Sequence, residues 1–441
     1  MSSFYWPRVC LLCATIVASG CVPIPVSTVP LQPREERPIA VESAQSENSG
    51  TFSSPVFDTS GVFVAAYDSG SNLVRIYRSS DLTQLNSLKP TRRPRRLSFS
   101  PSGHFLVIEA HQGWVEDYLQ GKSLSNVEID SPEAIRDDIQ RVEVWNLETG
   151  QTVHDLTCDA VEITEPSGGW LWARKKAISP GYRSSAILGA YFSSDETEFS
   201  ILCWNGVQQR WDSSNWKRIE DIPSPPFWDS LTPLVNALYW AQNPASSQSA
   251  DGRIAVLSVR EKRLGFGTTY VWNRNKGQVQ PLPGECATRY LPVYSLSSDG
   301  SRIVVICNNG LGCSVRAWDL VSGQEILLKN VDFGITRGAP LIRSEGVAIS
   351  PDGRYLAVAL LNLTEALVVT PLPIPLGISR CDLRLWSLED GKELVSIPID
   401  DLIFYSDYFR GADLAFSPDS ALLAVGGKRL RIYRLSDLSA F

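Results

Sequence analysis

Histidine is scarce in this sequence, which has three in 441 residues: His104, His111 and His154. A metal centre built from several histidines is therefore not expected. The Gly-x-Ser-x-Gly nucleophile turn and the His-Glu-x-x-His zinc motif are both absent. We therefore expect no catalytic residues, no metal site and no cofactor.

An excess of positive charge is also lacking, since the formal net charge is −7. That balance, together with the export signal described next, argues against a nucleic-acid partner. One compact basic cluster stands out, for which we expect contacts with acidic loops or lipid head groups. It comprises Arg92, Arg93, Arg95 and Arg96.

The N-terminal segment has an apolar core, Val9–Val17, that falls short of the roughly 20 residues of a membrane-spanning helix. Arg8 before the core and Ala18-Ser19-Gly20-Cys21 after it are typical of a secretory signal, residues 1–20. The small residues before the cysteine resemble a bacterial lipoprotein cleavage box. The resemblance implies cleavage after Gly20 and acylation (palmitate) of Cys21, with an ordinary signal peptide as the alternative. Because Val22 rather than Asp follows, the resemblance favours the outer membrane of the cell envelope.

Residues 21–49 are predicted to form a tether, because Val22–Pro38 is rich in proline. The last repeat described below has no clear fourth strand before Phe441. Ile39–Val41 is the expected donor of that strand, so that residues 39–42 close the last repeat. An incomplete, three-stranded last repeat is the alternative.

The remaining chain, residues 50–441, is organised around a repeated unit seen most clearly in Tyr294–Leu328. Val293–Leu296, Ile303–Cys307, Ser314–Leu320 and Glu325–Leu328 read as four strands separated by turn residues. Seven copies recur, each with a turn of the Ser-Pro-Asp-Gly kind, an apolar strand and a strand ending in Trp or Tyr. Repeats of about 45 residues with four strands each predict an all-β, seven-bladed β-propeller of antiparallel blades. The terminal aromatic residues are Tyr77, Trp145, Trp211, Trp272, Trp318, Trp386 and Tyr433.

The repeat resembles that of WD-repeat propellers, most closely at Val142–Gly150, Val315–Gly323 and Leu383–Gly391. The Gly-His pair of that family is absent throughout, so its histidine-centred hydrogen-bond network cannot form here. The resemblance implies a divergent, Ser-Pro-Asp-Gly-rich propeller that acts as a rigid interaction platform. The resemblance gives almost no information about the identity of the partner.

Six cysteines remain after the signal and Cys21, and export would permit disulfides. Cys307 and Cys313 flank a short loop between paired strands and form the candidate disulfide. Two reduced, buried thiols are the alternative. The other four cysteines, which form no Cys-x-x-Cys motif, cannot be paired from the sequence: Cys158, Cys203, Cys286 and Cys381.

Insertions in the repeats lie mostly between the second and third strands and between consecutive repeats, which places them on one face of a propeller. The main ones are His111–Gln140, Cys158–Arg183, Asn362–Arg380 and Asp400–Ala412, while Gln242–Asp251 is expected between the first two strands of the fourth repeat. The candidate partner-binding residues on them are aromatic; the alternative is that these side chains pack against the blades or fill the funnel. They are Trp170, Trp172, Phe404, Tyr405, Tyr408 and Phe409.

The leading hypothesis is therefore a non-catalytic, monomeric, lipid-anchored platform that binds a protein partner in the cell envelope. A propeller that binds carbohydrate or cell-wall glycan is the alternative, with Trp170 and Trp172 as sugar platforms. A propeller hydrolase that uses axial carboxylates is a further one, since fold does not determine function.

Overall fold

The computed structural model divides the chain into residues 1–38 and 39–441, and all of its described residues belong to the second part. Described are residues 42–46, 52–110, 137–138, 141–159, 161–162, 183–184, 187–203, 205–224, 246–249, 252–260, 267–274, 276–282, 293–297, 299–308, 313–331, 346–362, 365–369, 372–377, 380–399, 404–405, 408–409 and 413–439.

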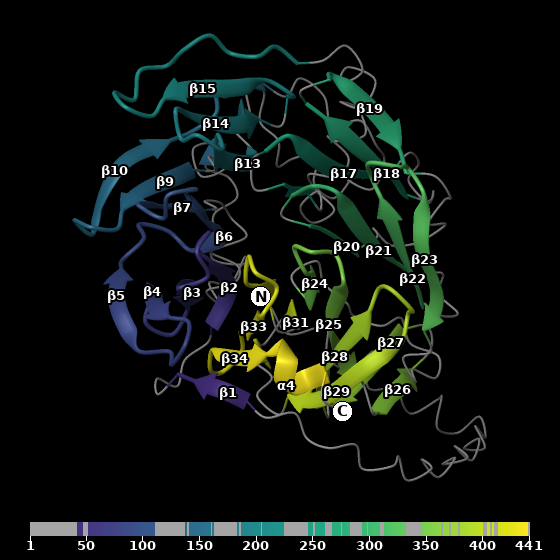
Figure 1. The fold of residues 1–441 in the computed structure, drawn as a ribbon. Coiled ribbons are helices and arrows are strands. Elements are labelled where there is room, and N and C mark those ends of the chain that lie inside the picture. Colours follow the sequence, from purple (N-terminus) through teal and green to yellow (C-terminus); the bar gives the residue numbers. More distant parts are fainter. Residues whose placement is uncertain are drawn as a thin grey trace, which may run out of the picture. The chain divides into compact units, whose positions relative to one another are not determined.

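Seven antiparallel sheets follow one another around a ring (Figure 1). We number these blades in chain order and call their strands a to d. Blade 1 is β2 (Phe52–Phe57), β3 (Phe63–Asp68), β4 (Leu73–Arg78) and β5 (Gln84–Leu88); blade 2 is β6 (Pro94–Phe99), β7 (Phe105–Ala110), β9 (Arg141–Asn146) and β10 (Gln151–Leu156). Blade 3 is β13 (Ile187–Phe192), β14 (Glu198–Cys203) and β15 (Gln208–Asp212); blade 4 is β16 (Ser246–Gln248), β17 (Ile254–Arg260), β18 (Gly267–Asn273) and β19 (Gln278–Pro281).

The second half of the ring is built in the same way. Blade 5 is β20 (Val293–Leu296), β21 (Arg302–Asn308), β22 (Cys313–Asp319) and β23 (Glu325–Val331); blade 6 is β24 (Val347–Ile349), β25 (Tyr355–Asn362), β28 (Arg380–Ser387) and β29 (Glu393–Ile399). Blade 7 is β32 (Leu414–Phe416), β33 (Leu422–Val425), β34 (Arg431–Arg434) and β1 (Glu42–Gln45), and the short helix α4 (Leu435–Ser439) follows β34. The predicted all-β, seven-bladed propeller is confirmed.

Blade 3 departs from the four-stranded pattern. Its outer position is taken by an irregular segment that contacts β15 through two isolated bridges, Gln208 with Ile222 and Trp211 with Arg218. Both backbone groups of Gln208 are bonded to Ile222 at 3.0 and 2.9 Å, so the edge of β15 is still covered. An irregular cover of this kind protects an edge strand without a full fourth strand.

The core lies between neighbouring blades. The b strands are buried on both faces, as in the uninterrupted apolar run Ile303–Ile306 of β21. One cluster packs Val304 of blade 5 on Trp386 of blade 6, and another packs Ala359 of blade 6 on Leu423 of blade 7. A strand that is buried on both faces needs a continuous apolar run rather than alternation, which explains the apolar segments after each turn.

The ring is closed by a strand from before the first blade. β1 pairs antiparallel with β34, with Glu42 opposite Tyr433. Ser46 sets the register, since its N–H donates to the Leu430 carbonyl and its Oγ accepts from the Leu430 N–H. The described closing strand is thus β1, Glu42–Gln45, and Ile39–Val41, the donor expected from the sequence, directly precedes it but lies outside the described residues.

Candidate interaction face

The two faces of the ring are built differently. The a–b and c–d turns leave on one face, which we call the turn face, and the b–c and d–a connections leave on the other, the insertion face. Blade 2 shows the contrast: β6 and β7 are joined by the turn 100–104, whereas 30 residues separate β7 from β9. β16 begins at Ser246, inside Gln242–Asp251. The prediction of a long a–b turn in blade 4 was therefore wrong, and the extra length precedes the a strand.

The a–b turns of blades 5, 6 and 7 share one hydrogen-bonding scheme that explains the Ser-Pro-Asp-Gly signature. In blade 6 the Ser350 hydroxyl donates to Asp352 Oδ1 at 2.6 Å and accepts the Tyr355 N–H at 2.9 Å. Gly353 has a φ of 67°, which glycine adopts without strain. In the equivalent turn of blade 5, burial alone would raise the pKa of Asp299, but hydrogen bonds from Ser297 and Ser301 lower it below its usual value.

These turns also touch one another all the way around the ring. Where the turn lacks glycine, the replacing side chain makes the contact: Glu196 (φ 57°) accepts from Ser102 of blade 2, and Ser420 (φ 59°) accepts the Asp352 N–H of blade 6. At each of the other five seams a residue of one blade lies against a turn of its neighbour, so that the turn face is joined all the way around the ring. These five contacts are Thr59 to Pro101, Tyr191 on Gly252, Ile254 on Gly300, Arg302 to Gly353 and Pro418 on Gly61.

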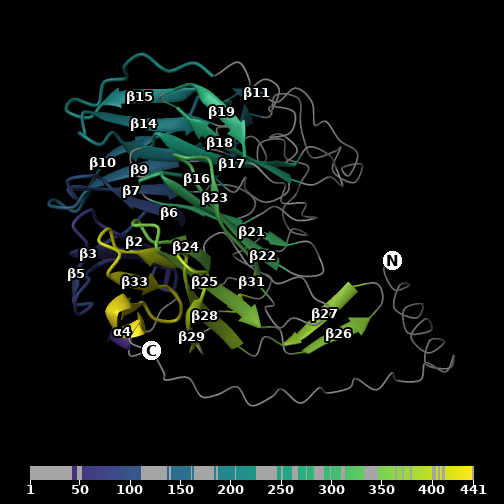
Figure 2. The same ribbon diagram turned by 45° about the vertical axis from the view of Figure 1, so that its right-hand side comes forward.

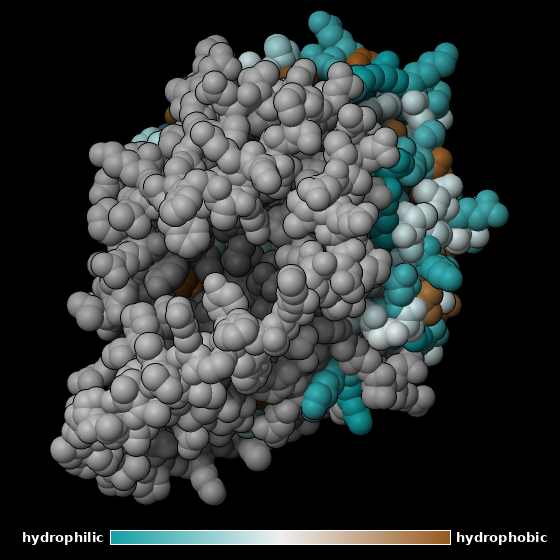
Figure 3. Space-filling model, turned by 180° about the vertical axis from the view of Figure 1, so that it is seen from behind, coloured by the Kyte–Doolittle hydropathy of each residue, from teal (hydrophilic) through white to brown (hydrophobic). Residues whose placement is uncertain are grey.

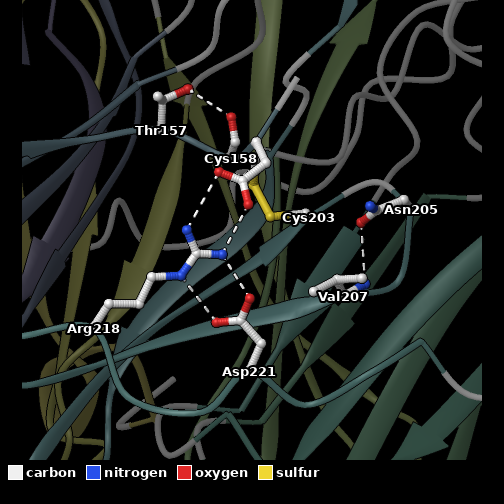
Figure 4. The surroundings of a disulfide bond; sticks show 8 residues. Thr157, Cys158, Cys203, Asn205, Val207, Arg218 and Asp221 are labelled. Atoms are coloured by element: carbon white, nitrogen blue, oxygen red, sulfur yellow. Dashed lines mark hydrogen bonds and ion pairs between the residues drawn. A yellow bond between two sulfur atoms is a disulfide. The ribbon is translucent and has the colours of Figure 1, made fainter. Parts of the chain in front are cut away.

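On the insertion face a disulfide joins blades 2 and 3. Cys158, just after β10, bonds to Cys203 at the end of β14, with an S–S distance of 2.04 Å (Figure 4). Both residues are 1% exposed. This bridge lies at the root of the insertion Cys158–Arg183. The sequence argument missed it because the partner of each cysteine is on another blade, although the repeat register places both at the same end of adjacent blades.

An ionic clamp lies beside the disulfide. The Arg218 guanidinium donates to Asp221 and to Asp159, which follows Cys158, with shortest distances of 2.6 and 2.8 Å (Figure 4). These hydrogen bonds, the one to Asp221 first, raise the pKa of Arg218. Surface ion pairs contribute little energy singly. Here the clamp adds a second link between the end of blade 2 and the outer segment of blade 3.

The same insertion is tied to its neighbour by a small sheet. β12 (Arg183–Ser184) pairs antiparallel with β11 (Val161–Glu162) and parallel with β8 (Asp137–Asp138), which belongs to the b–c insertion of blade 2. The two insertions of blades 2 and 3 thus meet in one substructure. Trp170 and Trp172, the predicted aromatic residues of this region, lie outside the described residues.

Two buried carboxylates lie near the basic cluster, and one of them pairs with it. Glu109 accepts the Ala190 N–H of blade 3 at 3.1 Å and lies 3.7 Å from the Arg96 guanidinium. Glu143 accepts from Trp145 Nε1 at 2.9 Å and from the Thr91 backbone at 3.0 Å. At least Arg96 of the basic cluster therefore has an acidic partner inside the ring.

Blade 6 carries two hairpins on the insertion face. β26 (Glu365–Val369) and β27 (Leu372–Gly377) form a two-stranded sheet within the b–c insertion. β30 (Phe404–Tyr405) and β31 (Tyr408–Phe409), which contain four predicted partner-binding residues, pair in the connection to blade 7. The structure thus brings these four residues together in one hairpin.

Other predicted site residues remain untested. Gly20 and Cys21 lie outside the described residues, and the side chains of Cys307 and Cys313 are not described. The strand register pairs Cys307 with Ser314 and Cys313 with Asn308, so the two cysteines are not directly opposite each other. The candidate disulfide between them stays a prediction.

Within the described ranges, no group of three or more His, Cys, Asp or Glu residues is placed to hold a metal ion. In the same part of the chain, no helix has the length and apolar character needed to cross a membrane. Figure 3 shows the ring from behind, where the described surface on the right is mostly hydrophilic with scattered apolar residues.

The arrangement defines the class of protein as a seven-bladed propeller with one rigid and one elaborated face. Among solved structures it is similar to the β-propeller domain of Cps50 (Swd1) from Myceliophteria thermophila, with a TM-score of 0.52 and 13% identity over 90% of this chain and 99% of that one. This likeness establishes the fold alone. No family model matches the sequence, and a search of curated proteins gave no match.

Proposed function

We propose that this protein is a non-catalytic interaction platform, anchored in the bacterial cell envelope through Cys21, that binds a protein partner with its insertion face. The observation that carries the proposal is the contrast between the two faces. Short turns contact one another on the turn face. The insertions of blades 2 and 3, which the disulfide and the small sheet β8–β12–β11 hold together, and the hairpins of blade 6 leave from the insertion face. Loops on a rigid scaffold are where binding residues concentrate.

The disulfide supports an envelope location. A buried disulfide between blades forms and persists in an oxidising compartment such as the periplasm, and is rare in the cytosol. It also supports a binding role for the insertion that it anchors, because a loop held at its root loses less entropy when a partner orders it. Trp170 and Trp172 are the proposed anchors there, and the aromatic hairpin β30–β31 is a second proposed contact.

The test is crosslinking in intact cells followed by mass spectrometry. In the decisive variant Asn-Gly replaces residues 163–182, because Glu162 pairs with Arg183 and a two-residue turn can join them. The control is Val321→Asp, at a residue 85% exposed on the turn face. One envelope protein captured by wild type and by the control but lost in the variant would support the platform. Equal capture by all three would refute a partner site on this insertion, and incorporation of labelled palmitate tests Cys21 separately.

A further inference from the structure

The hairpin β26–β27 differs from the rest of the insertion face in its composition. It extends blade 6 beyond the ends of β25 and β28 (Figure 2), and in the described structure it pairs with no other strand. No charged residue or histidine occurs from Ala366 to Ser379. A two-stranded hairpin is at best marginally stable in water unless an apolar face is covered.

Beyond Glu365, which pairs with Gly377 at the base of the hairpin, the register shows that both rows of the hairpin are apolar. Leu367 pairs with Ile374 and Val369 with Leu372, while the alternate row pairs Ala366 with Pro375 and Val368 with Pro373. A hairpin that is half polar could lie flat on a wet surface with one side in water. Without a polar row, the hairpin is suited to an environment that is apolar on both sides.

Two prolines restrict what that environment can be. Pro373 and Pro375 have no N–H, yet β27 remains paired with β26 through both. They therefore occupy positions whose N–H would face away from β26. An edge without donors at these positions is poorly suited to pairing with a strand of a partner protein. In hydrocarbon the same edge is favourable, because unpaired N–H groups are costly there.

The chain before β1 allows this face to reach a bilayer. Residues 21–41 would span roughly 60 Å if extended at about 3.1 Å per residue. The tether joins β1 at Glu42, the end of the strand nearer the turn face. The longest strands of the ring, such as the eight-residue β25, are only about 26 Å long. A tether of this length permits either face to lie on the membrane, so a further contact must determine which one does.

We propose that β26–β27 is a membrane-insertion hairpin that places the blade 6 side of the insertion face on the lipid bilayer. The proposal rests on the proposed envelope location and not on the acylation of Cys21. It assigns lipid to the hairpin β26–β27 and leaves the insertions of blades 2 and 3, together with the hairpin β30–β31, to the protein partner.

Flotation with lipid vesicles tests the proposal on the mature chain, residues 21–441, carrying Cys21→Ala, which lacks the apolar signal core Val9–Val17 and cannot be acylated. The vesicles contain phosphatidylethanolamine and phosphatidylglycerol, in buffer with and without 1 M salt (about 3 Å screening length). We expect the protein to float in both buffers. The double substitution Leu367→Asp, Ile374→Asp should lower the partition coefficient at least tenfold, and Val321→Asp on the turn face should leave it unchanged.

A second variant guards against misfolding. Asn-Gly replaces residues 363–379, because Asn362 pairs with Arg380 and a two-residue turn preserves that register. It should melt like wild type, fail to float, and still capture the protein partner through blades 2 and 3. The proposal is overturned if the Cys21→Ala chain does not float, or if both hairpin variants float as well as it does. Loss of a protein crosslink without any vesicle binding would also overturn it, since the hairpin would then bind protein.

Discussion

Removal of the disulfide between Cys158 and Cys203 should destabilise the ring measurably. The bridge closes a loop with a sequence separation of 45 residues. In the chain-entropy treatment, cross-linking a loop of that length lowers the entropy of the unfolded chain and so raises the free energy of unfolding by about 4 kcal/mol at 25 °C. At about 2.1 cal/mol/K per residue, the unfolding entropy of a ring of roughly 400 residues is about 0.8 kcal/mol/K, so the melting temperature should fall by about 5 °C.

The assay is urea denaturation and thermal melting of the Cys158→Ala, Cys203→Ala variant, beside wild type in oxidising and reducing buffer. Alanine avoids a buried unpaired hydroxyl in place of the sulfur. Cys307→Ala, Cys313→Ala is the matched control, and disulfide mapping by mass spectrometry identifies which pairs exist. Free thiols at both Cys158 and Cys203 in the native protein, or a loss of stability below 1 kcal/mol, would refute the reasoning.

Three further predictions concern the turns and the closing seam. Trp216→Gly relieves about 1 kcal/mol of left-handed backbone strain (φ 56°) but removes a half-buried indole that contacts His154 and Phe105. We therefore expect urea denaturation to show a net loss of roughly 1–2 kcal/mol in the free energy of unfolding. A gain in that free energy would show that the packing of the indole contributes little. Gly426→Ala would place a Cβ 2.7 Å from the Phe52 carbonyl oxygen at the seam between blades 7 and 1 and should cost about 2 kcal/mol, and an unchanged melting temperature would show that the seam yields. Because the pKa of Asp299 is lower in the folded state, this carboxylate contributes fully to the free energy of unfolding above its unfolded pKa of about 3.9, and the contribution is lost as the pH falls through the folded pKa. Asp299→Asn should therefore make the free energy of unfolding fall less steeply with decreasing pH. Parallel pH profiles for the variant and wild type would contradict this.

The propeller architecture could be predicted because the residues of each repeat are enough to indicate its turns and strands. Each Ser-Pro-Asp-Gly turn supplies a hydroxyl, a carboxylate and a left-handed position within five residues, so the local chemistry of one turn suffices to predict a hairpin. The strands of blade 5 begin and end within three residues of the expected positions, and the first strand, Val293–Leu296, matches at both ends. The exceptions are turns in which the glycine is replaced, at Glu196 and Ser420, where contacts with another blade determine the conformation.

What joins the blades could not be predicted in the same way. The partners of Cys158, Glu109 and Ser46 lie 45, 81 and 384 residues away along the chain. Composition and spacing carry no signal for such pairs, because each depends on the register of a blade relative to its neighbour. The described part of the closing strand is a similar case: Glu42–Gln45 pairs with β34, and Ser46 exchanges hydrogen bonds with Leu430, while Ile39–Val41, the donor expected from the sequence, lies outside the described residues.

Blade 3 is joined to blade 2 by different contacts on the two faces of the ring. It lacks a regular fourth strand, and two of its turns place a non-glycine residue, Glu196 and Trp216, at a left-handed position. On the turn face both side chains reach blade 2, Glu196 through Ser102 and Trp216 through Phe105 and His154. On the insertion face the disulfide and the Arg218 clamp join the same two blades. The seam between blades 2 and 3 is therefore fastened at both ends, by side-chain contacts on the turn face and by the disulfide and the Arg218 clamp on the insertion face.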